Sequence, residues 1–66
     1  MAYTVVIWRD GRADSMEEYD DRDQAVASAE QQIALAEHED VETLVINVWY
    51  GDDLITSKSY ARGDEA

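Results

Sequence analysis

The sequence predicts an α+β fold of order ββαββ, with a four-stranded antiparallel sheet and one helix packed on one face. Three observations predict it. Two pairs of strand-like runs are each joined by a tight glycine-containing turn, a helical apolar pattern separates the pairs, and no linker interrupts the 66 residues. The first and third runs are the most apolar, so they should lie centrally, which gives the spatial order 2-1-3-4. Residues 1–66 then form a single domain.

The first hairpin is predicted over residues 3–19. Tyr3 to Arg9 (YTVVIWR) is rich in β-branched and aromatic residues, which is typical of a strand. Asp10-Gly11 follows, a favoured pair for the type I′ turn, because that turn needs positive φ at both central positions. A second strand runs from about Ala13 to Tyr19 (ADSMEEY). Its charged character is typical of an edge strand, where charges discourage pairing with other chains.

A helix is predicted from about Arg22 to Glu37. Asp21 has the character of its N-cap, and Gln24 would complete a capping box. One apolar stripe at helical spacing should face the sheet, and Leu35 points away from that stripe and should be half exposed. The stripe consists of Val26, Ala29, Ile33 and Ala36, flanked by Ala25.

The second hairpin is predicted over residues 41–60. Val41 to Tyr50 (VETLVINVWY) is the strongest strand, and its core-facing row is Leu44, Ile46, Val48 and Tyr50. Gly51-Asp52-Asp53 should form a tight turn, after which Leu54 to Tyr60 returns as the fourth strand. The polar tail, residues 61–66, is expected to fray. One helix covers one face of this sheet, so the other face should stay open.

The charge balance is strongly acidic. Sixteen Asp and Glu face five Lys and Arg, which gives a net charge of −11 at pH 7. A hydrophobic content of 45% argues against disorder. A protein of this sign repels nucleic acid and anionic membranes, and it is attracted to basic surfaces such as nucleic-acid-binding grooves.

The residue types give little support to catalysis or metal binding. The chain has no cysteine, its only histidine is His38, and it has no Gly-rich phosphate loop. The acids of residues 20–23 and 52–53 lack the spacing of a calcium loop. We therefore expect no enzyme activity, no catalytic residue, no cofactor and no metal. The lack of cysteine and of a membrane-length apolar run favours the cytosol.

The acids predict a surface that binds a basic partner. Duplex DNA carries about one charge per 1.7 Å of its axis, and carboxylates on a rigid strand and helix can imitate that line of phosphates. A merely solvated face, or an adaptation to high salt, would have the same composition. The candidate partner-binding residues are Asp14, Glu17, Glu18, Asp20, Asp21, Asp23, Glu30, Glu37, Glu39 and Asp40.

The open sheet face is the second candidate surface. If both hairpins keep a simple two-residue register, Val6 and Val45 share this face with a possible aromatic anchor of Trp8, Trp49 and Tyr60. Exposed apolar patches mark protein interfaces, which would make the chain a small interaction or assembly module. Two alternatives are a homodimer through this face and simple shielding by the side chains of Arg9, Arg12 and Lys58. A monomer and a homodimer both remain open.

The small size, the acidity, the lack of cysteine and the ββαββ pattern together resemble small acidic phage-encoded anti-CRISPR proteins that inhibit type I systems as DNA mimics. The resemblance spans the chain but carries no diagnostic motif, so it transfers no site residue. It implies a partner, the Cascade surveillance complex, through the large subunit whose basic channel admits target DNA. It also implies that the protein acts in the host bacterial cytosol without binding nucleic acid itself.

Overall fold

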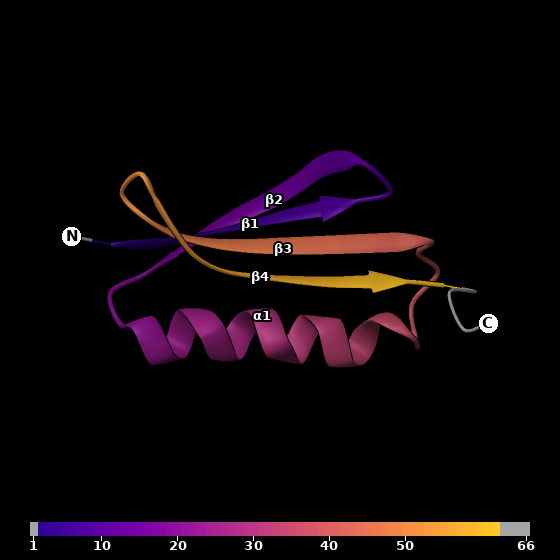
Figure 1. Cartoon of the computed structure of the whole chain (residues 1–66). Helices are drawn as coiled ribbons and strands as arrows, with labels where there is room; N and C mark the ends of the chain where they lie inside the picture. Colours follow the sequence, from indigo (N-terminus) through magenta and orange to yellow (C-terminus); the bar gives the residue numbers. More distant parts are fainter. Residues whose placement is uncertain (1, 63–66) are drawn as a thin grey trace.

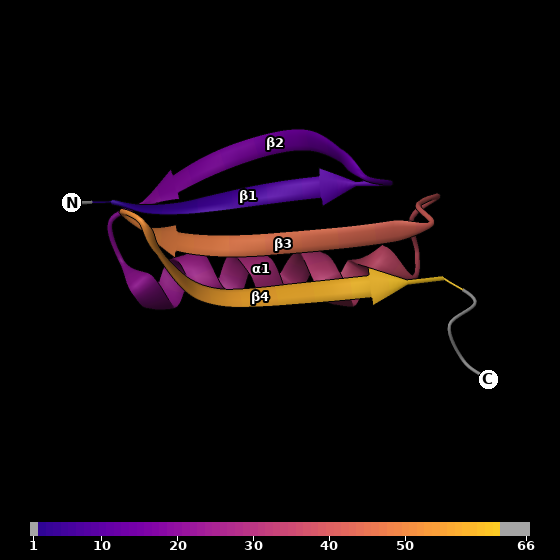
Figure 2. The same ribbon diagram turned by 45° about the horizontal axis from the view of Figure 1, so that its top comes forward.

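Four antiparallel strands form one sheet in the order β2-β1-β3-β4, and one helix lies across one of its faces. The computed structural model describes residues 2–62. The elements are β1 (Tyr3–Arg9), β2 (Arg12–Tyr19), α1 (Arg22–Ala36), β3 (Thr43–Tyr50) and β4 (Asp53–Ala61). Figure 1 shows α1 below the sheet, and Figure 2 shows the other face turned forward with α1 behind it. The predicted fold and strand order are confirmed.

Apolar residues at every second position of the two central strands form the core. Val5 opposes Val48 and Ile7 opposes Ile46, so these side chains point to the same face, toward α1. The helix contributes only alanines to the buried set, and their small side chains let its backbone approach the sheet closely. The buried residues are Val5, Ile7, Ala25, Ala29, Ala36, Val41, Leu44, Ile46 and Val48. A core this small gives a modest stability.

The helix begins where the sequence places it and ends one residue earlier than expected. The Asp21 carboxylate accepts a hydrogen bond from the backbone N–H of Asp23 at 3.4 Å, which confirms the N-cap. Gln24 makes no hydrogen bond to Asp21 within residues 2–62, so the expected capping box is not formed. Leu35 is 46% exposed, as expected, because it points away from the sheet.

The first hairpin has the predicted turn but not the simple register. Asp10 and Gly11 have φ of 55° and 82°, the positive values that a type I′ turn needs. Trp8 then pairs with Ala13 but Ile7 pairs with Ser15, so Asp14 is an extra residue in β2. This β-bulge places Met16 opposite Val6, on the face away from the helix.

The second hairpin contains the same kind of irregularity, and it overturns one prediction. Trp49 pairs with Leu54 but Val48 pairs with Thr56, so Ile55 is the extra residue. A one-residue slip moves every later side chain to the opposite face. Tyr60 therefore lies opposite Leu44 and packs against the core, and its predicted place on the open face is wrong.

β4 ends one residue later than the sequence suggested. Ala61 is the last residue of the strand, and the backbone N–H of Arg62 donates to the Glu42 carbonyl at 2.8 Å. β4 therefore extends one residue beyond the predicted end at Tyr60, and the fraying of residues 61 and 62 stays a prediction. Residues 63–66, which the same prediction covered, lie outside the described residues.

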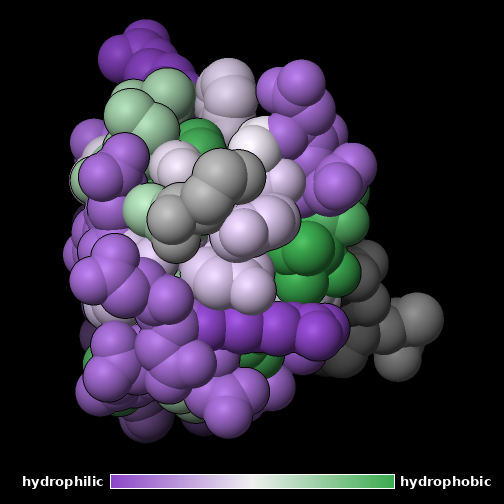
Figure 3. All heavy atoms as spheres, turned by 90° about the vertical axis from the view of Figure 1, so that its left-hand side faces the viewer, coloured by the Kyte–Doolittle hydropathy of each residue, from purple (hydrophilic) through white to green (hydrophobic). Residues whose placement is uncertain are grey.

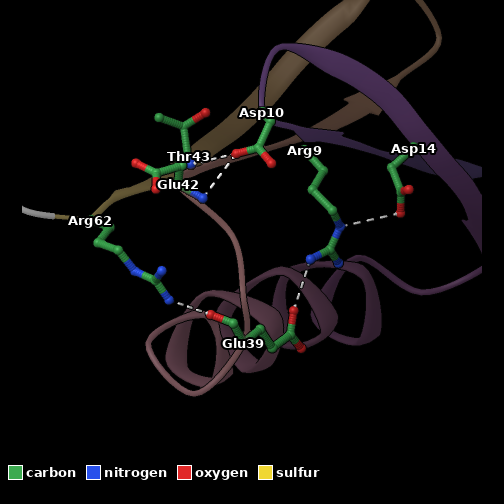
Figure 4. A network of polar contacts seen from close by, with 7 residues as sticks. All are labelled: Arg9, Asp10, Asp14, Glu39, Glu42, Thr43 and Arg62. Atoms are coloured by element: carbon green, nitrogen blue, oxygen red, sulfur yellow. Dashed lines mark hydrogen bonds and ion pairs between the residues drawn. The ribbon is translucent and has the colours of Figure 1, made fainter.

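A polar network ties the β1–β2 turn to the loop between α1 and β3 (Figure 4). One carboxylate oxygen of Asp10 accepts hydrogen bonds from the backbone N–H groups of Glu42 at 2.9 Å and Thr43 at 3.0 Å. Arg9 pairs with Glu39 at 3.0 Å, and the Arg62 guanidinium donates to the carbonyl of Glu39 at 2.7 Å. The network therefore joins segments about 30 residues apart in the sequence.

The two backbone hydrogen bonds, the one from Thr43 first, hold the pKa of Asp10 below its ordinary value of 3.8. Because the pKa of Asp10 is lower in the folded state than in the unfolded state, the ionised carboxylate stabilises the fold at pH values above the unfolded-state pKa. That contribution is lost as the pH falls through the lower folded-state pKa. Asp10→Asn keeps an acceptor oxygen and a residue that tolerates positive φ, but it replaces the ionisable carboxyl group by a neutral amide. We expect the variant to be less stable at pH 7 and the difference to shrink below about pH 4.

Urea unfolding at several pH values between neutrality and about pH 2.5 measures this difference. Glu37→Gln is the matched control, because it removes one exposed carboxylate near the same loop. In this variant the free energy of unfolding should change with pH as it does in the parent protein. A gap between Asp10→Asn and the parent that stays constant across this range would contradict the proposed role of the Asp10 carboxylate.

Candidate functional site

The pairing of the strands brings two separate acidic segments to one end of the molecule. Tyr19, Tyr3, Tyr50 and Asp53 lie side by side across the four strands. The end of β2, the start of α1 and the β3–β4 turn therefore meet at the same end, on the left in Figure 1. We call this the acidic end, and its acids are Glu18, Asp20, Asp21, Asp23, Asp52 and Asp53.

The acidic end differs from the rest of the surface in its lack of counter-charge. All six of its acidic residues are exposed, and Arg22 is its only basic side chain among residues 2–62. None of these seven residues takes part in an ion pair within the part of the chain that the structure describes. Their negative charge therefore faces solvent without a basic partner among the described residues.

Most of the other predicted partner-binding acids are engaged within the chain. Arg9 pairs with Asp14 at 3.7 Å and with Glu39 at 3.0 Å. The hydrogen bond to Glu39, the largest contribution, raises the pKa of Arg9, so the guanidinium stays charged. The remaining pairs join Lys58 with Glu30 at 3.6 Å, Arg62 with Asp40 at 3.6 Å and His38 with Glu37 at 3.7 Å.

Glu17 is also engaged, although it lies only one residue from Glu18. Its side chain accepts hydrogen bonds from the Tyr19 hydroxyl at 2.7 Å and from the Ser28 hydroxyl at 3.3 Å, and the second of these joins β2 to α1. The ten predicted acids thus do not form one continuous stripe. Glu18, Asp20, Asp21 and Asp23 stay together, and Asp52 and Asp53 join them.

The acidic end has two groups of carboxylates with tyrosines between them. Three strand spacings of about 4.8 Å separate β2 from β4, so the ends of these two strands, which carry Glu18 and Asp53, lie ~14 Å apart across the sheet. This separation is comparable to the ~12 Å width of the DNA major groove, which two lines of phosphates border. Tyr3 and Tyr50 stack between the groups with ring centroids 4.6 Å apart. Figure 3 looks onto this end and shows hydrophilic residues bordering a paler centre.

The face of the sheet opposite α1, which we call the open face, is largely apolar and carries little charge. Trp8 pairs with Val45 and Thr4 with Trp49, so both tryptophans point away from the helix, as predicted. The apolar residues of the open face are Val6, Trp8, Ala13, Met16, Val45, Trp49, Leu54 and Ala61, and its polar ones are Thr4, Glu18, Thr43, Asn47, Ser57 and Ser59. Glu18 is the only charged residue among them.

Basic side chains do not shield this face. Arg9 and Lys58 oppose the core residues Leu44 and Ile46, and they pair with Glu39 and Glu30 on the helix side. Arg12 opposes Arg9 and so belongs to the same side. Shielding by Arg9, Arg12 and Lys58 is therefore ruled out as an explanation of the open face. Trp8, Met16 and Leu54 remain 39%, 67% and 50% exposed.

The bulge in β2 hollows the open face beside β1. A depression of about 350 Å³ is lined by Val6, Ala13, Asp14, Ser15 and Met16. Its lining is mostly apolar, and Asp14 is its one charged member. No sequence signal indicated it, because it depends on the extra residue in β2.

The described residues hold no group of three or more His, Cys, Asp or Glu side chains placed to bind a metal ion. Within residues 2–62, no helix has the length and apolar character that crossing a membrane requires. Comparisons with protein-family models, with curated proteins and with solved structures found no match to this chain. The chemistry of its two surfaces is thus the basis for proposing a function.

Proposed function

We propose that this chain is a non-catalytic inhibitor whose acidic end occupies a basic, nucleic-acid-binding surface of a protein partner and keeps nucleic acid from it. The observation that supports this most is the gathering of six exposed acidic residues from two distant segments, which have one arginine among them and no ion pair within residues 2–62. Carboxylates without internal partners keep their charge available to the arginines and lysines of another protein.

The length of the molecule also fits a nucleic-acid-sized site. Its longest extent is 39 Å, and its net charge is −11. A basic groove that is shaped for a nucleic-acid backbone can therefore meet a strongly negative surface on this protein, and the anions bound in that groove can be released.

The resemblance to small acidic anti-CRISPR proteins supplies the first partner to test, a type I Cascade complex and in particular its DNA-admitting large subunit. Bound there, the protein would block recognition of target DNA and would neither cut nor modify it. Other basic nucleic-acid-binding proteins fit the same surface chemistry, because the acidic end matches their charge and not a particular sequence.

The salt dependence of binding to purified Cascade tests this proposal. We expect the affinity to fall at least about ten-fold between 50 and 200 mM salt, because screening and counterion release act on each charged contact. A neutral solute at matched osmolarity is the control and should have little effect. Binding that keeps its strength across the salt range, or no binding to Cascade at all, would count against the proposed partner and mode.

A further inference from the structure

The open face is long enough for a helix. Four strands at ~4.8 Å and seven residues at ~3.3 Å give a face about 19 by 23 Å. A helix about 10 Å wide and 15 residues long, close to 22 Å, spans the length of such a face and covers about half of its area. The depression lined by Val6, Ala13 and Met16 lies on this face and offers a place for an apolar side chain of such a helix.

The spacing of the two tryptophans also suits a helix. Trp49 pairs with Thr4 and Trp8 pairs with Val45, so the two indoles are four residues apart along the paired strands, ~13 Å. Side chains at i and i+7 or i+8 on one face of a helix are ~11–12 Å apart. A helix with apolar residues at that spacing can place one beside each tryptophan and another over Met16.

Charge decides which helix fits and argues against a second copy of this chain. Glu18 lies on the open face, and the β3–β4 turn, which carries Asp52, rises on the same side (Figure 1), whereas Arg9, Lys58 and Arg62 are each paired with an acid of the chain. Face-to-face stacking of two copies would bring together two chains that each carry a net charge of −11. An occupant with an apolar stripe and basic flanks would complement both features.

We propose that the open face binds an amphipathic helix of a partner protein, with its apolar side on Trp8, Met16 and Trp49 and lysine or arginine beside Glu18 and Asp52. Bound there, the helix completes a three-layer arrangement, with α1 on one face of the sheet and the partner's helix on the other. This surface shares Glu18 and Asp52 with the acidic end, but its apolar residues Trp8, Met16 and Trp49 lie outside that end, so the inference does not rest on the proposed function.

Synthetic peptides test the proposal on the full chain. One peptide of about 18 residues, long enough to be helical, has leucines at i, i+3, i+4 and i+7 and lysines on the flanks. A second has glutamate in place of lysine, and a third has the first composition in scrambled order. Tryptophan emission and calorimetry measure binding. We expect a blue shift with the lysine peptide and an affinity at least about ten-fold above that for either of the others.

Variants locate the site. Met16 is 67% exposed, so Met16→Lys should leave the fold intact while it weakens binding of the lysine peptide at least about ten-fold. Trp8→Ala should do the same. Leu35→Ala, on the exposed side of α1, is the matched control and should bind as the parent protein does.

Three outcomes would overturn the inference: no binding of the lysine peptide, equal binding of all three peptides, or binding that Met16→Lys and Trp8→Ala leave unchanged. Sedimentation equilibrium measures whether the protein itself forms a dimer. A dimer that the Trp8→Ala substitution dissociates would overturn the inference as well, because a second copy would then occupy the open face. Variants of Asp20, Asp23 and Asp53 should bind the peptide normally, so the proposal for this surface and the proposal for the acidic end can be contradicted separately.

Discussion

Ile46→Ala is expected to lower the free energy of unfolding by about 2–5 kcal/mol. Ile46 is fully buried in the middle of β3, opposite Ile7. Its loss removes apolar contacts and leaves a cavity between the sheet and a helix whose buried residues are all alanines and cannot fill the space. A domain of this size has only a few kcal/mol of stability, so the variant should be largely unfolded at physiological temperature.

Urea unfolding followed by circular dichroism measures the loss. Ile46→Val is the graded control and should cost about 0.5–1.5 kcal/mol, because it removes one methylene from the same position. Leu35→Ala removes a large side chain that is 46% exposed and should cost clearly less than Ile46→Ala. An Ile46→Ala variant that loses under about 1 kcal/mol would mean that the core of the described structure is wrong.

Neutralising three carboxylates of the acidic end is expected to weaken displacement of DNA from the basic partner by at least about ten-fold. The variant combines Asp20→Asn, Asp23→Asn and Asp53→Asn, which lie outside every ion pair of the described residues. Asp21 is kept because its side chain caps α1. The fold should remain, since the cost of losing Asp23 from the first turn is only about 0.3–1 kcal/mol.

The matched control carries the same change in net charge at the other end of the molecule. It combines Glu37→Gln, Asp40→Asn and Glu42→Gln, and we expect less than about a three-fold effect, because general attraction is screened beyond ~8–10 Å. Equal losses in the two variants would show that net charge alone acts. In that case a solvated face or an adaptation to high salt would explain the acids better than a DNA-like surface.

The sheet order and the core followed from patterns that are local in the sequence. The alternation of Leu44, Ile46 and Val48 marks one face of a strand, and Asp10-Gly11 marks a turn whatever the rest of the chain does. The helix stripe was nearly right, although Ala25, Ala29 and Ala36 take the buried places and Val26 and Ile33 are half-buried. Small side chains let the helix approach the sheet most closely. A pattern of apolar positions does not show which of them are small enough to lie at the closest contact.

The side of the sheet on which β4 residues fall could not be predicted, because an extra residue leaves no clear local signal. Ile55 is an ordinary strand residue in the sequence, yet as a bulge it turns Tyr60 from the open face to the core. The ion pairs were equally hidden, since Arg9 and Glu39 are 30 residues apart. The acidic end could have been found by writing out the strand pairing, which places Asp53 in line with Tyr19.

Competition between this protein and duplex DNA for one basic partner tests the central claim most directly. Labelled target duplex is bound to Cascade, the protein is added, and both the released DNA and the bound protein are measured at one fixed salt concentration. We expect each ligand to exclude the other, so that excess protein releases the duplex and excess duplex releases the protein. A ternary complex in which Cascade holds both ligands at once would contradict the proposal that the acidic end takes the place of nucleic acid.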